Sequence, residues 1–236
     1  MSDEMKGIVL LSGGLDSATV TGIALNKGYE LLALSFDYGQ RHRIELERAK
    51  KIADHYSLEH KIFRIDLTQI GGSSLTSDIE VEQGSLNRDE NYIPNTYVPS
   101  RNIIFITIAS SIAEVREIET IFIGANALDY SGYPDCRPEF FNAMRDTLNK
   151  GTKLGILNGF KLEVPLQYLK KSEIIKLGIS IGVPYELTHS CYLGREKACG
   201  KCDSCLLRLR GFMEAGIEDP VEYDYLPEFY KKKDRK

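Results

Sequence analysis

The fold is decided by one stretch near the N-terminus, Gly7-Ile8-Val9-Leu10-Leu11-Ser12-Gly13-Gly14-Leu15-Asp16-Ser17. Its first half, residues 7–11, is continuously apolar rather than alternating, which is typical of a parallel strand buried on both faces. Residues 18–26 have the composition of a helix that stops at Lys27-Gly28. We therefore expect a glycine turn that joins a buried strand to the N-terminus of a helix.

That turn, Ser12–Ser17, has the chemistry of an anion site. Backbone N–H groups at a helix N-terminus have no intrahelical partner, and with the helix dipole they attract anions. The two glycines allow positive φ and close approach of a phosphate, and the two serines add hydroxyl donors. Because Asp16 would repel a phosphate, we expect it to bind Mg²⁺ that accompanies the phosphate. The alternative is a simple turn in which Asp16 or Ser17 caps the helix.

Length and composition limit the class of protein. A chain of 236 residues suffices for one α/β domain with a small appendage, and its 42% hydrophobic and 27% charged residues are ordinary for a globular protein. The net charge of −4 gives no general attraction to nucleic acid. The acidic N-terminus does not resemble a signal peptide, and no apolar run approaches the roughly 18 residues of a membrane span. We expect a cytoplasmic protein without membrane contact.

Strands and helices are expected to alternate along the chain. The expected strands after the first are residues 30–36, 61–67, 120–125 and 162–166, and the expected helices after the first are residues 44–56, 103–114, 140–148 and 171–181. This order indicates a doubly wound, mainly parallel sheet, in which ligands bind at the carboxyl ends of the strands. Residues 12–17 and 37–42 both lie at such ends. Residues 70–98 have no clear periodicity and are either a mobile linker or a lid over the substrate.

The C-terminal part carries a cysteine cluster with the spacing C-x7-C-x2-C-x2-C. Its members are Cys191, Cys199, Cys202 and Cys205. An odd total of five cysteines without a secretion signal indicates a metal site in a reducing compartment rather than disulfides. Four thiolates are typical of a closed structural zinc site, which would fasten a helix over residues 206–213. An iron–sulfur cluster is the alternative; unlinked packed thiols are less expected. Cys136 stands apart, as a nucleophile or a packed side chain.

Residues 129–139 are dense in functional side chains. They include carboxylates at Asp129, Asp135 and Glu139, a guanidinium at Arg137, and rings at Tyr130 and Tyr133. This segment follows the expected strand 120–125, so it lies at the same sheet edge as the phosphate loop. A planar heterocycle would suit it, because rings stack on its face and a carboxylate accepts paired N–H bonds from an amidine-like edge. A rigid surface turn with solvated charges is the alternative.

Six motifs in this order resemble one enzyme family. They are SGGLDS (12–17), FDYGQRH (36–42), VPSRN (98–102), DYSGYPDCRPEF (129–140), SCYLG (190–194) and CGKCDSCLLR (199–208). The first is the SGGxDS loop of PP-loop ATP pyrophosphatases, which split ATP between the α and β phosphates to adenylate a substrate. Together they resemble the 7-cyano-7-deazaguanine synthase (preQ0 synthase) family over nearly the whole chain. His189 departs from that pattern, where an aromatic residue such as tryptophan is expected, and residues 194–198 are slightly altered.

The resemblance implies a fold, a reaction and a set of ligands. The fold would be adenine nucleotide alpha hydrolase-like, with residues 1–188 as the ATP and substrate domain and residues 189–236 as a zinc-binding helical appendage packed on it. The reaction would convert 7-carboxy-7-deazaguanine and ammonia into the nitrile, with ATP and Mg²⁺, as a step in queuosine biosynthesis. The appendage would hold one structural Zn²⁺ per chain through the four clustered cysteines.

The site residues follow from the same resemblance and from the reading of the loops. We expect ATP to contact Leu10, Leu11, Ser12, Gly13, Gly14, Leu15, Asp16, Ser17, Ala18, Thr19 and Val20. We expect the deazaguanine substrate to contact Tyr38, Gln40, Arg41, Arg101, Asn102, Asp129, Tyr133, Asp135, Arg137 and Glu139. The catalytic residues would be Asp16 and Lys171, the latter steadying the phosphates or the acyl-adenylate; an ordinary solvated lysine at a helix start is the alternative for Lys171. Whether Asp129 or Asp135 reads the base edge stays open.

A second class of function also fits the phosphate loop. PP-loop enzymes that modify tRNA directly, by thiolation or lysidine formation, need an RNA-binding surface and often extra domains. The net charge of −4 and the single-domain length argue against them. A zinc-knuckle RNA binder would leave the SGGLDS loop unexplained. We therefore expect small-molecule partners, no direct nucleic-acid contact and no membrane, with a homodimer as an allowed assembly.

Overall fold

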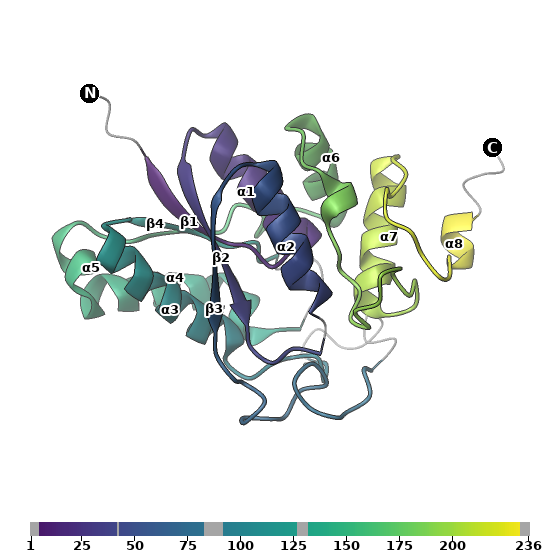
Figure 1. Ribbon diagram of the computed structural model, residues 1–236, viewed down its shortest axis with the longest axis horizontal. Coiled ribbons are helices and arrows are strands. Elements are labelled where there is room, and N and C mark those ends of the chain that lie inside the picture. Colours follow the sequence, from purple (N-terminus) through teal and green to yellow (C-terminus); the bar gives the residue numbers. More distant parts are fainter. Residues whose placement is uncertain (1–4, 42, 83–91, 127–131, 232–236) are drawn as a thin grey trace.

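The computed structural model describes residues 5–41, 43–82, 92–126 and 132–231 and has a five-stranded sheet at its centre (Figure 1). The strands are β1 (Lys6–Leu10), β2 (Glu30–Asp37), β3 (Glu59–Arg64), β4 (Thr120–Phe122) and β5 (Lys161–Glu163). They are ordered β3-β2-β1-β4-β5, and every neighbouring pair is parallel. The predicted parallel sheet is thus confirmed, and β1 lies at its centre.

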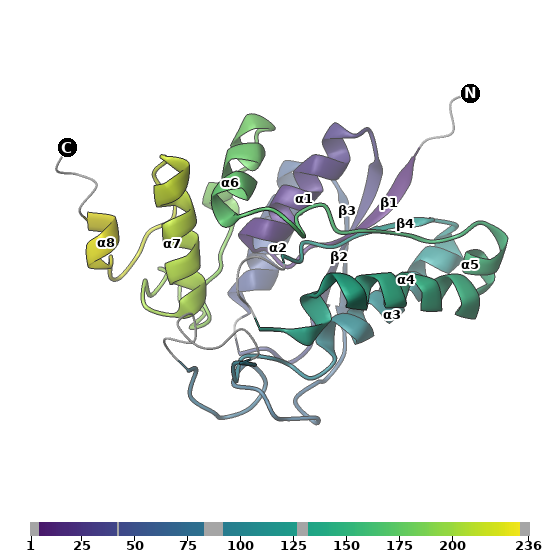
Figure 2. The ribbon, with the colours of Figure 1, turned by 180° about the vertical axis from the view of Figure 1, so that it is seen from behind.

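Helices cover both faces of the sheet, as Figures 1 and 2 show. The α-helices are α1 (Leu15–Asn26), α2 (Ile44–His55), α3 (Arg101–Arg116), α4 (Pro138–Gly151), α5 (Lys153–Leu157), α6 (Lys171–Ser180), α7 (Asp203–Ala215) and α8 (Glu228–Lys231), and the short 3-10 turns are η2 (Pro134–Cys136) and η3 (Tyr185–Leu187). On β1, Ile8 packs with α3 and α4, whereas Val9 packs with α1, α2 and α6. Both side chains are fully buried, which explains why the strand is continuously apolar. The doubly wound architecture is confirmed.

The boundaries of several elements differ from the prediction. The strand expected over residues 162–166 ends at Glu163, since Pro165 has no N–H for a ladder hydrogen bond. The strand expected over residues 120–125 ends at Phe122, after which the chain turns toward the N-terminus of α1. The sequence does not predict α5, a single five-residue helix whose first turn is capped by the Thr152 hydroxyl. The described parts of 70–98 contain neither helix nor strand, as expected.

The C-terminal segment packs on the sheet domain through α7, which lies beside α6 (Figures 1 and 2). Arg208 on α7 is buried and donates to the Thr188 hydroxyl at 2.6 Å and to the Tyr185 carbonyl at 3.3 Å. It also forms two hydrogen bonds, of 2.8 and 2.9 Å, with the carboxylate of buried Asp219. One guanidinium therefore joins the sheet domain, α7 and the tail. The domain boundary at residue 188 stays a prediction.

Not one helix within the described ranges has the length and apolarity to cross a bilayer.

Candidate active site

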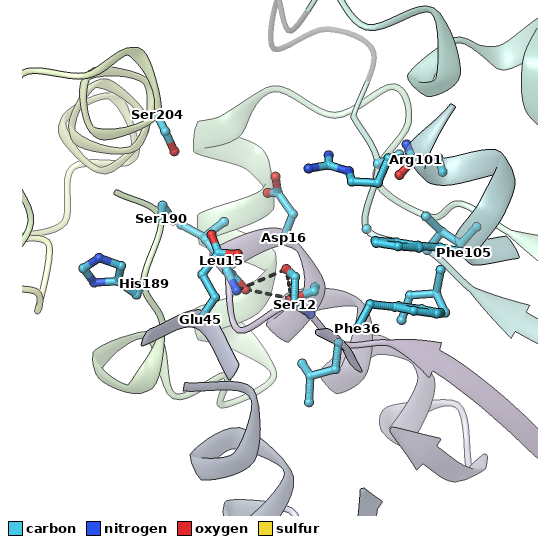
Figure 3. A pocket seen from close by; sticks show the side chains of 18 of the residues that line it. Ser12, Leu15, Asp16, Phe36, Glu45, Arg101, Phe105, His189, Ser190 and Ser204 are labelled. Atoms are coloured by element: carbon cyan, nitrogen blue, oxygen red, sulfur yellow. Dashed lines mark hydrogen bonds between the residues drawn. The ribbon is translucent and has the colours of Figure 1, made fainter. Parts of the chain in front are cut away.

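A cavity of about 330 Å³ lies at the carboxyl edge of the sheet, where α/β proteins bind ligands. The segments after β1, β2 and β4 line one part of it, and residues of α1, α2, α3, α6 and α7 together with the segment 189–192 line most of the rest (Figure 3). Polar or charged lining residues include Ser12, Asp16, Ser17, Tyr38, Gln40, Glu45, Arg101, Asn102, Lys171, His189, Ser190, Tyr192, Ser204 and Arg208. The cavity thus combines the predicted phosphate loop with side chains from distant parts of the chain.

The phosphate loop is held by its own two serines. The hydroxyls of Ser12 and Ser17 lie 3.0 Å apart, and Ser17 also donates to the Gly14 carbonyl at 3.0 Å. Gly14 is the N-cap residue of α1, and no side chain caps this helix. The reading in which Asp16 or Ser17 caps α1 is therefore wrong. The first amides of α1 remain available at the cavity, as an anion site requires.

Two glycines let this loop sit against its neighbours. Gly13 has φ +85°, and a Cβ there would lie 2.3 Å from the Glu45 carbonyl oxygen, at the start of α2. A Cβ on Gly124, just after β4, would lie 2.9 Å from the backbone of both Asp16 and Ser17. A side chain at Gly13 would push the loop away from α2, and one at Gly124 would separate the loop from the end of β4. The role of Gly124 has no signal in the sequence, because it depends on how β4 packs against α1.

Asp16 forms an ion pair with Lys171 from the first turn of α6. The Lys171 ammonium lies 2.8 Å from both carboxylate oxygens of Asp16, and the two side chains are only 13% and 29% exposed, respectively. A Cβ on Gly211 of α7 would lie 2.3 Å from Cγ of Lys171, so the glycine makes room for the lysine stem. The alternative of an ordinary solvated lysine is wrong. The pair also explains how a carboxylate is tolerated within a phosphate loop.

The opposite wall of the cavity is aromatic and carries a cation. The rings of Phe36 and Phe105 stack at 3.9 Å with an interplanar angle of 2°, and Tyr38 lies against Phe105 at 5.4 Å. Arg101 projects beside them (Figure 3), with its guanidinium 3.5 Å from the Tyr38 hydroxyl. Burial alone would lower the pKa of Arg101, but the neighbouring Tyr38, Tyr133 and Asp135 hold its pKa above the usual value. Arg101 is therefore a permanent positive charge on this wall.

The segment that begins at residue 132 supports this wall from behind. Asp135 is 5% exposed and accepts a hydrogen bond of 3.0 Å from the backbone N–H of Asn102, in the first turn of α3. The Asn102 side chain donates in return to the Asp135 carbonyl at 2.9 Å. Ser100, the N-cap residue of α3, has φ 56° and makes no side-chain cap, so Asp135 replaces it. Burial raises the pKa of Asp135.

Several predicted site residues lie away from the cavity. Six predicted residues do not line the cavity: Gly13, Ala18, Thr19, Val20, Tyr133 and Asp135. The three from α1, Ala18, Thr19 and Val20, are fully buried, and Tyr133 bonds to Thr96 at 2.7 Å. Arg137 and Glu139 are exposed and do not line it either. Arg41 is exposed and pairs with Asp78, and Asp129 lies outside the described residues. Gln40 lines the cavity, but its amide braces the turn by bonds to Tyr38 N and Phe36 O.

The structure adds lining residues that the sequence reading missed. They include Phe36, Glu45, Phe105, Cys136, His189, Ser190, Tyr192, Ser204, Leu207 and Arg208. Glu45 could have been found, because it follows the carboxyl end of β2 by a few residues. The lining residues of α7, which are Ser204, Leu207 and Arg208, could not have been found from the sequence, because they reach the cavity only through the packing of α7 against α6. Leu75 also lines the cavity, so part of the aperiodic segment contacts the candidate site.

The four clustered cysteines form a pocket of their own. Their Sγ atoms all lie within 4.8 Å of one another, and the side chains are buried. Cys205 Sγ lies 3.9 Å from Cys199 Sγ and 3.4 Å from Cys202 Sγ, close to the roughly 3.8 Å expected between thiolates on one tetrahedral zinc ion. Four backbone N–H groups donate to the sulfurs of Cys191 and Cys199 at 3.3–3.4 Å. Such donors favour thiolates, so the cluster could bind a metal ion.

His189 links the cysteine cluster to the phosphate loop. Its backbone N–H donates to the Gly13 carbonyl at 2.9 Å, two residues before Cys191. Its ring is buried, and neither ring nitrogen has a hydrogen-bond partner among the described residues. The backbone contact means that the position of the cysteine cluster and the position of the loop depend on each other.

One family model and curated relatives of one name match this chain over most of its length. The family model described as "Queuosine biosynthesis protein QueC" matches residues 6–216. The 7-cyano-7-deazaguanine synthase of Picrophilus torridus is 61% identical over 226 residues, covering 96% of this chain and 95% of that protein. The synthase of Pseudomonas paraeruginosa is 51% identical over 226 residues, covering 94% and 99%.

Solved structures show a similar fold at low sequence identity. An NMN synthetase from Francisella tularensis has a TM-score of 0.50 at 18% identity, covering 91% of this chain and 78% of that one. A 4-thiouridine synthetase in complex with RNA and ATP has a TM-score of 0.50 at 19% identity, covering 89% and 53%. These similarities support the PP-loop architecture and extend no further than the fold.

Proposed function

Because the chain belongs to the queuosine biosynthesis protein QueC family, we propose that it is a 7-cyano-7-deazaguanine synthase. This enzyme is an ATP-dependent carbon–nitrogen ligase that makes the nitrile from 7-carboxy-7-deazaguanine and ammonia. Within this structure, one observation supports the proposal most directly. The phosphate loop, with the uncapped N-terminus of α1, and the Arg101 cation line the same cavity. The family membership favours this activity over direct modification of tRNA.

The chemistry requires two activations, because a carboxylate must lose both of its oxygens to become a nitrile. In the first, a carboxylate oxygen attacks the α-phosphorus of ATP and pyrophosphate leaves. Ammonia then attacks the acyl carbon, and AMP leaves with the electron pair of the carbon–oxygen bond to give the amide. In the second, the amide oxygen attacks the α-phosphorus of another ATP and pyrophosphate leaves; AMP then departs with the electron pair of the carbon–oxygen bond as the amide nitrogen loses two protons. The protein mainly positions the reactants and neutralises charge.

The phosphate side of the cavity would hold ATP. The free amides at the start of α1, with Ser12 and Ser17, would bind the phosphates. Asp16 offers the kind of hard oxygen ligand that Mg²⁺ takes, and bound Mg²⁺ would offset phosphate charge. Lys171, now paired with Asp16, would supply further positive charge to the phosphates or to the acyl-adenylate.

The aromatic side of the cavity would hold the deazaguanine. Its ring would stack on the Phe105 side of the Phe36–Phe105 pair, since Phe105 is the less buried of the two rings. Arg101 would neutralise the 7-carboxylate until it is adenylated. We assign this role to Arg101 rather than to exposed Arg137, because Arg101 lines the cavity and Arg137 does not. Asp135 would contribute by fixing the start of α3.

The cysteine cluster would hold one structural Zn²⁺ ion. Four thiolates leave no coordination position for a catalytic water, and bound zinc would stabilise the fold of the C-terminal segment. Elemental analysis should give one zinc per chain, and replacing Cys202 by Ser should lower zinc content and melting temperature together. Iron in a brown preparation would instead indicate a cluster. The homodimer and the absence of direct nucleic-acid contact stay predictions.

Mass spectrometry of the products tests the proposed activity. The chain is incubated with 7-carboxy-7-deazaguanine, ATP, Mg²⁺ and ammonium, with omission of each component as the control. The expected products are the nitrile, AMP and pyrophosphate, with the 7-carboxamide appearing first. Absence of both deazaguanine products, together with modification or gel retention of bulk tRNA, would instead support the tRNA-modifying alternative.

A further inference from the structure

The proposed reaction releases protons, and a group in the cavity must accept them. Ammonium, the main form of ammonia at neutral pH, must lose a proton before its nitrogen can attack the acyl-adenylate. Among the described residues that line the cavity, Asp16 and Glu45 are the two with carboxyl groups. Asp16 is held by Lys171 through both of its oxygens. Glu45 is therefore the carboxyl group in the described lining that is not committed to a cation.

The backbone places Glu45 beside the phosphate loop. It is the second residue of α2, and its carbonyl oxygen is the atom that a Cβ on Gly13 would meet at 2.3 Å. In the view of Figure 3 its side chain extends from α2 toward the loop that carries Asp16. Within the described part of the chain, no hydrogen bond or ion pair joins its carboxyl oxygens to another residue. A half-buried, uncommitted carboxyl group thus faces the place where the adenylate would form.

The surroundings of Glu45 suit proton transfer. Burial raises the pKa of Glu45 to about 7, although Arg101 across the cavity lowers it in part, and Cys191 adds to the rise. A base works best when its pKa is near the operating pH, because it is then both available and strong enough. The other charged groups around the cavity, the Asp16–Lys171 pair and Arg208, already have partners of opposite charge.

We infer that Glu45 binds ammonium in the cavity and accepts its proton before the attack on the acyl-adenylate. This inference rests on the proposed function. One N–H bond of ammonium breaks, the proton goes to a Glu45 carboxyl oxygen, and the electron pair stays on nitrogen. The nitrogen then bonds to the acyl carbon while AMP leaves with the electrons of the carbon–oxygen bond. The nitrogen loses its second proton to water as the amide forms.

The test separates adenylation from ammonia attack. Adenylation is measured as exchange of labelled pyrophosphate into ATP that depends on 7-carboxy-7-deazaguanine. Attack is measured as amide plus nitrile formed with ammonium, and as hydroxamate formed with hydroxylamine, which is largely unprotonated at neutral pH and needs no base before it attacks. The variant is Glu45→Gln, which keeps size and hydrogen bonding. Glu47→Gln is the matched control, because Glu47 is exposed in the same first turn of α2 and does not line the cavity.

The expected result is a selective loss. Glu45→Gln should keep exchange within about twofold and hydroxamate formation within about threefold, but lose about 100-fold in the reaction with ammonium, in the range of general-base effects. Glu45→Asp should recover part of the loss, and Glu47→Gln should resemble the wild type. Three results for Glu45→Gln would each overturn the inference. The variant could lose exchange and the ammonium reaction equally, lose the reactions with both nucleophiles equally, or lose no activity. Absence of exchange in the wild type would overturn the proposed function itself.

Discussion

Two loops of this molecule follow carboxyl ends of strands, yet they relate differently to the cavity. In the phosphate loop of residues 12–17, the serine and aspartate side chains line the cavity, next to the free amides of α1. In the described part of the second loop, residues 132–139, only Cys136 lines it. Tyr133 bonds to Thr96, ahead of α3, Asp135 bonds to the first turn of α3, and Arg137 and Glu139 are exposed.

A local motif predicts backbone contacts better than it predicts side-chain contacts. An anion site of backbone amides needs only a strand, two glycines and a helix start, which are all contiguous in the sequence. A side-chain site depends on which way each residue faces after α3 and the loop have packed. Asp135 accepts a hydrogen bond from the backbone of α3. The segment 129–139, whose side chains suggest direct recognition of the base, therefore helps to hold Arg101 in place instead. The predictions below test this contrast between a contacting loop and a supporting loop.

The largest effect is expected at Asp16. Asp16→Asn should reduce substrate-dependent pyrophosphate release by about 1,000-fold, because it removes the partner of Lys171 and the expected Mg²⁺ ligand. A rate loss of this size is typical when an enzyme loses one electrostatic contact that stabilises the transition state. Stopped-flow measurement of pyrophosphate release and a circular-dichroism spectrum would check activity and fold. Glu139→Gln, which removes an exposed carboxylate of the second loop, should change the rate by less than about twofold. Near-normal turnover of Asp16→Asn at low Mg²⁺ would contradict its role.

The next effect concerns the cation that faces the substrate. Arg101→Ala should raise KM for the deazaguanine about 100-fold, or about 3 kcal/mol, with a smaller change in KM for ATP, since it removes a charge-assisted contact. The penalty should be smaller for the 7-carboxamide, which carries no charge. Arg137→Ala serves as the control from the second loop and should have little effect. If steady-state kinetics gave the large effect to Arg137 instead, the second loop would contact the substrate.

A smaller effect is expected at Asp135, where it should appear as lost stability. Asp135→Ala removes the acceptor for the Asn102 N–H and should lower the free energy of unfolding by about 1–2 kcal/mol, as for loss of a helix cap. Urea denaturation measures that loss, and kinetics on the folded variant measure KM. A large rise in KM for the deazaguanine with unchanged stability would show that Asp135 reads the base edge directly.

The smallest effect is expected at Tyr133. Tyr133→Phe loses the 2.7 Å bond to Thr96 but keeps the ring, so we expect about 0.5–1 kcal/mol of lost stability and nearly unchanged KM values. Thermal unfolding and steady-state kinetics check both quantities. A KM change that exceeds the effect of Asp135→Ala would place the Tyr133 hydroxyl at the substrate.

Much of the fold could be predicted because it depends on local pattern. The apolar run at residues 7–11, the glycine turn and the alternation of elements predict the parallel sheet and the phosphate site at its edge. The cysteine spacing likewise predicts that four thiols meet, since x2 spacings turn neighbouring sulfurs to one side. The missed α5 and the early end of β5 show the limit, where a single cap or a proline decides a boundary.

The architecture, the phosphate loop and the cysteine cluster were therefore readable from the amino-acid sequence, because each is announced by a residue pattern within a short segment. Only the tertiary structure decided that Lys171 meets Asp16, 155 residues away, and that Arg101 rather than Arg137 faces the cavity. It also decided that Glu45 lies beside the loop without a hydrogen-bond or ion-pair partner in the described part of the chain, and that α7 lines one side of the cavity. The physical reason is that side-chain direction and burial depend on how helices from distant segments pack on the sheet, which no local periodicity encodes.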